Sequence, residues 1–335
     1  MIFLWIVVFI ASLALLVKSA DWLLEASERI GLAIGLSPFI VGVLIVGLGT
    51  SFPEVIAAFA ALFEGATEII PATAMGSNIA NILLIVGFSA VIGRRLAVTK
   101  NLIDLDLPLL AITTVVLLVV SFDGVIVLPE SVILILSYVI YLVYTIVYKD
   151  DDAGSEFEGV GDILPDREER RGHSKWRKGL FVTYKVVNPK DVGLVVLGAI
   201  GLIVGAKYLI ESVIQISSVF DIAPSIIAIS AVAFGTSLPE LLVSLRAASK
   251  NKSEVALGNI FGSNVFNALV VVGAPGLFGT LIVDEQTRLI GLPFLAIATL
   301  FLIPPDISEG NLLSTSLRST RLMTSFALCI ISESV

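Results

Sequence analysis

The sequence predicts an all-α membrane protein built from two inverted-topology repeats of about five transmembrane helices each. Three observations carry this prediction: an apolar composition, nine apolar runs of spanning length, and motifs that recur at one constant offset. Of the 335 residues, 56% are hydrophobic and 15% are charged. Because an ordinary soluble domain is about 25% charged, the composition alone favours a membrane protein.

The nine runs fall into two sets separated by a polar segment. A helix needs about 20 apolar residues to cross the hydrocarbon, and each run reaches or nearly reaches that length. They lie near residues 2–20, 36–62, 70–92, 107–122, 126–148, 191–214, 223–245, 255–280 and 287–304. We therefore expect a first membrane half at 1–148, a cytoplasmic loop at 149–190 and a second membrane half at 191–335.

The C-terminal tail fits this scheme less well. Its apolar core of about eleven residues is too short to cross a membrane alone, and Arg318 and Arg321 precede it. Whether the tail forms a tenth helix therefore stays open at this stage. Truncation or an altered reading frame would each explain it.

Lysine and arginine concentrate in alternate loops, which sets the expected orientation. Three basic residues follow the third run, nine lie between Lys149 and Lys190, and three follow the seventh run. Because basic loops stay in the cytoplasm, we expect the N-terminus outside the cell membrane and the central loop inside. A cleaved signal peptide at the first run is the alternative, but the chain lacks the basic start that such a peptide needs.

A few charged residues beside the runs have an ordinary interpretation. We expect Asp21, Glu25, Lys207 and Glu211 to sit near helix ends, where long side chains reach the membrane interface. The acidic run at 150–152 is expected to be a solvated loop, because no EF-hand spacing accompanies it.

The two halves repeat the same motifs. TSFPE begins at Thr50 and returns as TSLPE at Thr236, and GSNIANIL begins at Gly76 and returns as GSNVFNAL at Gly262; the offset is the same for both motifs. One offset held over this distance indicates that the halves share one fold. With an odd number of spans per half, the second copy is inverted in the membrane. Inverted repeats with interrupted helices at matching positions are typical of secondary transporters with a midplane site.

The first motif of each repeat places a helix breaker beside an acid. Pro53 and Pro239 lack an N–H and free a backbone carbonyl, which is costly in a membrane unless a cation or a donor satisfies it. We therefore expect each helix to be broken there. The oxygen atoms around the two breaks belong to Thr50, Ser51, Glu54, Thr236, Ser237 and Glu240. An all-oxygen set suits Ca²⁺ or Na⁺ better than zinc or copper.

The second motif of each repeat adds hydroxyl and amide oxygens. Ser77 and Asn81 are four residues apart and share a helix face, and Ser263 and Asn267 repeat the pair. If this face meets the broken helix, both motifs contribute to one pocket. The simpler interpretation is that the asparagines bridge helices and the serines bond the preceding turn.

The two glutamates determine the expected charge of this pocket. Acids inside a membrane are costly and indicate function by default. Glu54 and Glu240 would be neutralised by one Ca²⁺, or several Na⁺ could fill the same pocket. Like charges in a low dielectric repel, so the two fillings exclude each other, which is the basis of exchange. A dry carboxylate without a cation tends to take up a proton, so we expect inhibition at low pH.

The quoted motifs, GLGTSFPE with GSNIAN and AFGTSLPE with GSNVFN, resemble those of the cation/calcium exchanger superfamily, most closely its prokaryotic sodium/calcium exchangers. The resemblance covers nearly the whole chain. It implies a ten-helix exchanger fold that exchanges Na⁺ for Ca²⁺ by alternating access, in which the first and sixth helices slide across the others. It implies no cofactor beyond the transported ions.

The same resemblance implies a role for individual residues. Calcium would be bound by carboxylate and backbone oxygens of Glu54, Glu240, Thr50 and Thr236. Sodium would be bound by hydroxyl and backbone oxygens of Ser51, Ser77, Ser237, Ser263, Gly47 and Ala233. Asn81 and Asn267 would line the centre. Some relatives carry an aspartate in place of Asn267, which weakens a case for potassium co-transport, and the tail departs from the family's tenth helix.

Other functions stay open on the sequence alone. A proton/calcium exchanger is the main alternative. An intramembrane enzyme that uses Glu54 and Glu240 as acid and base is less favoured because no nucleophile accompanies them. A net charge of −8 argues against nucleic acid as partner, and a single His173 and a single Cys329 argue against zinc. The expected partners are Ca²⁺, Na⁺ and the lipid bilayer; the oligomeric state stays open, with a monomer as one option.

Overall fold

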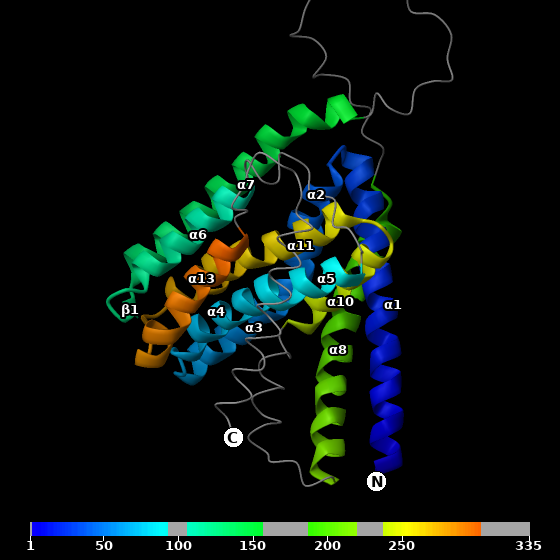
Figure 1. Cartoon of the computed structure of the whole chain (residues 1–335), viewed down its shortest axis with the longest axis horizontal. Helices are drawn as coiled ribbons and strands as arrows, with labels where there is room; N and C mark the ends of the chain where they lie inside the picture. Colours follow the sequence, from blue (N-terminus) through cyan, green and yellow to red (C-terminus); the bar gives the residue numbers. More distant parts are fainter. Residues whose placement is uncertain (1, 93–105, 157–186, 220–236, 303–335) are drawn as a thin grey trace, which may run out of the picture.

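Two helical halves, each beginning with one very long helix, make up the computed structural model (Figure 1). The structure describes residues 2–92, 106–156, 187–219 and 237–302. The first half consists of α1 (Ile2–Ile34), α2 (Pro38–Val41), the π-helical turn η1 (Gly42–Val46), α3 (Gly47–Glu64), α4 (Ile69–Ala80), the π-helical turn η2 (Asn81–Ile85), α5 (Val86–Ile92), α6 (Leu107–Val120), β1 (Val125–Ile126) and α7 (Leu128–Glu156). The second half consists of α8 (Pro189–Val219), α10 (Leu238–Ser249), α11 (Ser253–Phe266), the π-helical turn η6 (Asn267–Val271), α12 (Gly273–Gly276), β2 (Leu281–Ile282), the π-helical turn η7 (Thr287–Gly291) and α13 (Leu292–Leu302).

Most of the predicted spans are helical. Within the described ranges, six helical segments are long and apolar enough to cross a membrane, and two more apolar helices are shorter. The shorter ones cover Leu107–Val120 and Thr287–Leu302. The run predicted at 223–245 is described only from residue 237, after which α10 begins. The doubtful tenth run lies outside the described residues.

Local sequence signals explain where the helical segment from Pro38 to Glu64, which carries the TSFPE motif, begins and ends. Ser37 caps its start, because its hydroxyl accepts a hydrogen bond from the Ile40 N–H at 3.4 Å, and Pro38 occupies the first turn. Gly65 ends it with φ of 78°, a left-handed conformation that glycine adopts without strain.

The predicted break at Pro53 is not seen. Instead α3 continues through Pro53, and the irregularity lies about two to three turns earlier in η1, where the Gly47 N–H bonds to the Gly42 carbonyl five residues back. The expectation was wrong because a proline removes only one hydrogen bond, which a continuing helix tolerates when an adjacent turn adjusts its register. In the second repeat Pro239 lies in the first turn of α10, where no helical bond is lost.

The helices α1 and α8 pack side by side (Figure 1). Small residues of α8 allow this approach: a Cβ added to Gly198 would lie 2.9 Å from the backbone nitrogen of Leu23, and Gly205 faces Leu16 in the same way. Both helices are longer than predicted. α1 has 33 residues because it continues past Asp21, Glu25 and Glu28, whereas α8 has 31 because it extends a few residues beyond each end of its apolar run.

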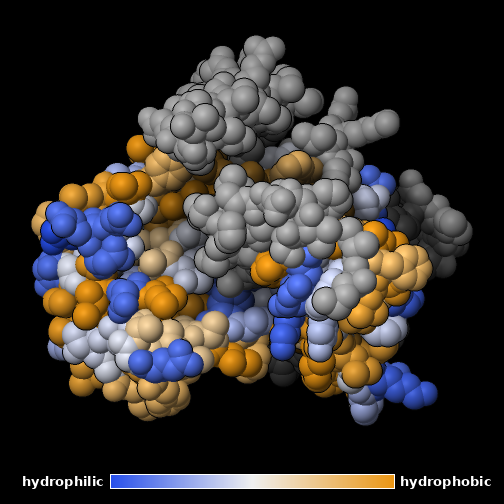
Figure 2. Space-filling model, turned by 90° about the horizontal axis from the view of Figure 1, so that it is seen from below, coloured by the Kyte–Doolittle hydropathy of each residue, from blue (hydrophilic) through white to orange (hydrophobic). Residues whose placement is uncertain are grey.

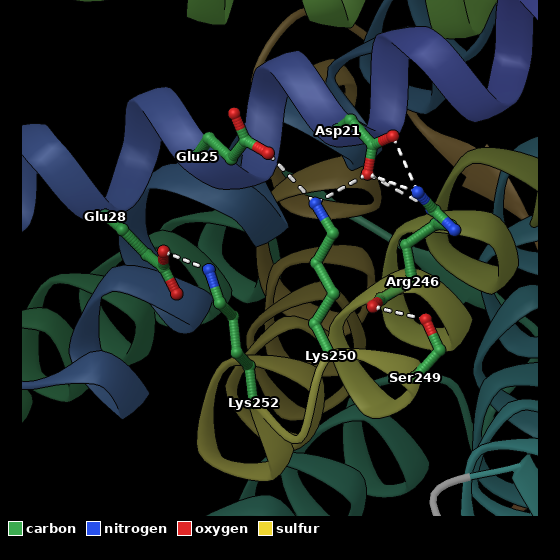
Figure 3. A network of polar contacts seen from close by, with 7 residues as sticks. All are labelled: Asp21, Glu25, Glu28, Arg246, Ser249, Lys250 and Lys252. Atoms are coloured by element: carbon green, nitrogen blue, oxygen red, sulfur yellow. Dashed lines mark hydrogen bonds and ion pairs between the residues drawn. The ribbon is translucent and has the colours of Figure 1, made fainter.

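Acidic residues of α1 pair with basic residues in the last turn of α10 and in the turn that joins it to α11 (Figure 3). The ion pairs are Asp21–Arg246 at 2.7 Å, Asp21–Lys250 at 2.8 Å, Glu25–Lys250 at 3.0 Å, and Glu28–Lys252. Asp21 and Glu25 therefore lie well inside a long helix and are paired within the protein. The prediction that they sit near a helix end was wrong for these two residues, because α1 continues to Ile34 and their partners belong to a segment that is far away in sequence and close in space.

The two halves also join through a short sheet and a shared core. β1 and β2 pair antiparallel, with Val125 opposite Ile282 and Ile126 opposite Leu281. One buried cluster involves α3, α4, α6, α7, α11 and α13, and a second involves α1, α8 and α10.

Large apolar side chains remain on the outside of the protein. Figure 2 shows hydrophobic residues over much of the face viewed there, with hydrophilic residues among them. Phe63, Phe122 and Phe278 are each more than 70% exposed. Such a surface would be a liability in water, whereas lipid tails accommodate it without cost. The surface therefore agrees with a multi-pass membrane protein.

Candidate cation site

Glu54 and Glu240 are both buried in the interior, on helices of the two repeats that pack against each other. Glu54 lies on α3 and Glu240 lies in the first turn of α10, and the two residues are 3% and 1% exposed. α3 packs against α10, and Ser51, one turn before Glu54 on α3, contacts the carboxylate of Glu240. The structure thus brings together the two acids that the repeat placed at matching positions.

Ser51 links the first motif of one repeat to the acid of the other. Its hydroxyl donates a hydrogen bond to Oε1 of Glu240 at 3.0 Å, and the serine is fully buried. A hydrogen bond to a carboxylate is stronger than one between neutral groups. Ser51 therefore holds one oxygen of Glu240 in place while the other remains available.

Thr50 connects α3 to α11. Its hydroxyl lies 3.2 Å from the carbonyl oxygen of Gly47 and 3.2 Å from Oδ1 of Asn259, and these two acceptors share its single proton. It also lies 3.5 Å from the hydroxyl of Ser263. The predicted residues Gly47, Thr50 and Ser263 are consequently neighbours across the boundary between the repeats.

The second motifs of the two repeats are also in contact. The side-chain amide of Asn78 on α4 donates to the backbone carbonyl of Asn264 on α11 at 2.9 Å. Ser77 precedes Asn78 and is buried at 4% exposure. Because α4 is tied to α11 in this way, Ser77 lies on the helix that meets the second repeat.

Asn81 and Asn267 occupy equivalent places in the architecture. Each is fully buried and begins a π-helical turn, η2 and η6 respectively. η2 packs against α10 and α11, whereas η6 packs against α3 and α4. Each amide therefore lies on a turn of one repeat that contacts the motif helices of the other repeat.

Several buried polar atoms here have no hydrogen-bond partner among the described residues. They are both carboxylate oxygens of Glu54, Oε2 of Glu240, the hydroxyl of Ser237, and both amide atoms of Asn81 and Asn267. A buried polar group without a partner costs about 1–3 kcal/mol, so a concentration of such groups calls for an explanation. A cation would satisfy the oxygen atoms among them.

The set of available atoms favours a hard cation. In the described part of the chain, no group of three or more His, Cys, Asp or Glu side chains could hold a metal ion. Two carboxylates together with hydroxyl, amide and backbone oxygens are the ligand types of Ca²⁺. Thr236 and Ala233, two further predicted ligands, lie outside the described residues.

One buried polar residue escaped the sequence reasoning. Asn259 on α11 contacts Thr50, Glu240 and Ser244 and is fully buried. Its equivalent in the first repeat, at the offset that relates the motifs, is Thr73. An asparagine stands at this position in only one repeat, so the motifs that recur in both repeats do not include it.

A family model and relatives of known sequence match this chain. The model described as "Sodium/calcium exchanger protein" matches residues 4–147 and 190–331. The inner membrane protein YrbG of Escherichia coli K12 is 31% identical over 274 residues, which cover 80% of this chain and 78% of that protein. A Ca²⁺/H⁺ antiporter of Aphanothece halophytica is 27% identical over 324 residues, which cover 90% of this chain and 83% of that protein.

A solved structure agrees with the fold over nearly the whole length. The sodium/calcium exchanger from Methanococcus jannaschii matches with a TM-score of 0.74 and 27% sequence identity. The match covers 97% of this chain and 97% of that chain. The two structures are therefore similar in both membrane halves and in the arrangement of these halves.

Proposed function

The chain belongs to the sodium/calcium exchanger protein family, and we propose that it exchanges Na⁺ for Ca²⁺. Membership of this family makes the chain a multi-pass membrane cation exchanger that transports calcium and is not an enzyme. The observation that carries calcium is the pair of buried carboxylates, Glu54 and Glu240, with unpartnered oxygens; the hydroxyl groups around them favour Na⁺ over H⁺ as the second ion. One Ca²⁺ balances the two negative charges.

The two carboxylates are the proposed centre of the calcium site. Oxygens of Glu54 that lack a hydrogen-bond donor among the described residues, and Oε2 of Glu240, are free to ligate the ion. The backbone oxygen of Thr50 is the proposed neutral ligand, and the repeat makes that of Thr236 its counterpart. Oxygen ligands of mixed charge are what Ca²⁺ requires.

Sodium takes the surrounding neutral oxygens in this proposal. The proposed ligands are the hydroxyls of Ser51, Ser77, Ser237 and Ser263 and the carbonyls of Gly47 and Ala233, with Asn81 and Asn267 lining the centre. Supporting this, the Ser51 hydroxyl already contacts Glu240 and the Ser263 hydroxyl lies near Thr50. Because the sodium positions adjoin the carboxylate pair, cations there and Ca²⁺ would repel each other and compete.

The proposed orientation has the N-terminus outside and the central loop in the cytoplasm. The basic turn at Arg246, Lys250 and Lys252 would then be cytoplasmic. The ion pairs with α1 support one part of this arrangement, since they place the C-terminal part of α1 and the basic turn on the same side of the protein. An accessibility experiment with cysteines introduced at this turn would test it.

Transport in proteoliposomes tests which two ions are exchanged. Vesicles loaded with Na⁺ are diluted into Na⁺-free buffer, and entry of radioactive calcium is followed. We expect uptake that depends on the Na⁺ gradient and collapses in the Glu54→Gln and Glu240→Gln variants. Calcium uptake that does not depend on the Na⁺ gradient, or that persists in either variant, would contradict the proposal.

A proton/calcium exchanger is the second candidate. One relative, from Aphanothece halophytica, is named a Ca²⁺/H⁺ antiporter, and a carboxylate pair can carry protons as well as calcium. Replacing the Na⁺ gradient with a pH gradient in the same vesicles distinguishes the two. Calcium uptake driven by the pH gradient alone would favour this candidate over sodium exchange.

A further inference from the structure

Asn259 uses its whole side-chain amide to connect three segments of the chain. Its Oδ1 accepts from the hydroxyl of Thr50 at 3.2 Å. Its Nδ2 donates to the backbone carbonyl of Glu240 at 3.3 Å and to the hydroxyl of Ser244 at 2.9 Å. Asn259 is fully buried, so water does not compete for these bonds. Both ends of the amide are therefore satisfied, unlike those of Asn81 and Asn267.

The bonds of Asn259 act on two residues of the candidate site without using the atoms that would bind an ion. The bond to Glu240 is made with its backbone, which leaves the carboxylate free. It fixes the first turn of α10, which begins at Leu238 without a side-chain cap. The bond to Thr50 draws the hydroxyl proton toward Asn259 and the Gly47 carbonyl.

This arrangement exists in only one repeat. At the constant offset between the repeats, the equivalents of Asn259 and Ser244 are Thr73 and Ala58. Ala58 cannot accept a hydrogen bond through its side chain, and threonine has no amide that donates and accepts at opposite ends. The bracing of the Glu240 turn by Asn259 and Ser244 is thus specific to the second half.

We propose that Asn259 is a positioning residue of the exchanger, which holds Glu240 and Thr50 in the geometry that binds Ca²⁺. This inference rests on the proposed function, because it concerns the same pair of carboxylates. Ligands must be held close to their binding geometry by supporting hydrogen bonds, and loss of such support weakens metal binding by about 10–100-fold in known sites. Asn259 supplies that support from α11 to both motif helices.

The test compares Asn259→Ala with Thr73→Ala in the proteoliposome assay. For Asn259→Ala we expect the KM for Ca²⁺ to rise about tenfold, with the maximal rate changed much less. Thr73→Ala, at the equivalent position of the other repeat, should leave the KM within about twofold of the parent. An Asn259→Ala protein that elutes as a single species but retains the parent KM would overturn the proposal, as would an equal loss in both variants.

A double-mutant cycle separates positioning from general loosening of the fold. If Asn259 acts through Thr50, Thr50→Val should raise the KM less in the Asn259→Ala background than in the parent. Additive effects would overturn the link to Thr50.

If Asn259→Ala does not fold, Ser244→Ala removes only one bond and should shift the KM in the same direction by a smaller factor. An unchanged KM would then count against the proposal. A parent without Na⁺-driven uptake would instead refute the proposed function.

Discussion

The hydroxyl of Ser51 donates a hydrogen bond to Oε1 of Glu240 at 3.0 Å, although the two residues are far apart in the sequence. The serine belongs to the first repeat and the acid to the second, and both are buried. One repeat therefore orients the carboxylate of the other. Neither half could form this arrangement alone, so the site depends on the docking of the two halves.

Removal of that hydroxyl should weaken ion binding. In Ser51→Ala, Glu240 loses a donor and the proposed sodium site loses a ligand. We expect about a tenfold higher Na⁺ requirement for exchange, because a hydrogen bond to a charged group contributes about 1.5–3 kcal/mol. Na⁺-dependent calcium flux at varied Na⁺ measures this. Ser249→Ala, an exposed serine that bonds only the Arg246 carbonyl in the described structure, is the control and should behave as the parent.

Neutralising either buried acid should nearly abolish calcium transport. Glu54→Gln and Glu240→Gln keep the size of the side chain but leave a single negative charge for a divalent cation, so we expect calcium binding to weaken by about a hundredfold or more. Titration calorimetry of the purified protein with Ca²⁺ measures the affinity. Glu64→Gln on the same helix, where the acid is exposed, should bind normally. Comparable binding in all three variants would remove the carboxylates from the site.

Acid should inhibit transport through the same pair. Ca²⁺ binding requires ionised Glu54 and Glu240, and protons compete with the cation for these oxygens, so uptake should fall as the pH is lowered. The assay is run with the same pH inside and outside the vesicles, so that no pH gradient drives flux. Raising the calcium concentration should restore uptake in acid. An acid effect that saturating calcium does not relieve would point to another group.

A second effect of pH should act on stability alone, at Asp284. Hydrogen bonds from the Thr287 hydroxyl at 2.5 Å and from the Thr287 N–H at 3.0 Å hold the pKa of Asp284 below its usual value. A lowered folded-state pKa means that stability is gained above the unfolded-state pKa, near 3.8, and is lost as the pH falls below it. Asp284→Ala should therefore lower the unfolding free energy by about 1 kcal/mol at neutral pH, as for the loss of a helix cap.

Thermal unfolding in detergent at two pH values measures this difference. The parent and Asp284→Ala should unfold at different temperatures at neutral pH and converge in strong acid. Glu285→Ala, the exposed neighbour, is the control and should match the parent throughout. A difference that persists in acid would show that the Asp284 bonds do not depend on its charge.

The repeat offset was the most informative feature of the sequence. It placed Glu54 and Glu240 at matching positions, and residues at matching positions of inverted copies meet near the axis between them. It could not predict the role of Asn259, whose equivalent is Thr73. An interaction that breaks the symmetry of the repeat leaves no trace in a comparison of its two copies.

Hydropathy located the spans but misjudged their ends. The predicted first span stopped before Asp21, whereas α1 continues to Ile34 because Arg246 and Lys250 neutralise the acids on its side. A window of apolar residues cannot detect partners from a distant turn. Likewise, the proline signal at Pro53 indicated an irregular helix correctly, but the location of the irregularity in η1 depends on hydrogen-bond register and not on composition.

The acids of α1 that pair with the basic turn are regularly spaced along the helix. Asp21, Glu25 and Glu28 succeed one another at intervals of four and three residues, so they lie along one face of the helix. An axial displacement of α1 by one helical pitch, about 5.4 Å, would bring each acid close to the place its predecessor leaves. After that step Glu25 would take the place of Asp21 and Glu28 that of Glu25, so two of the three acidic positions would stay filled, while Lys252 would lose its acidic partner.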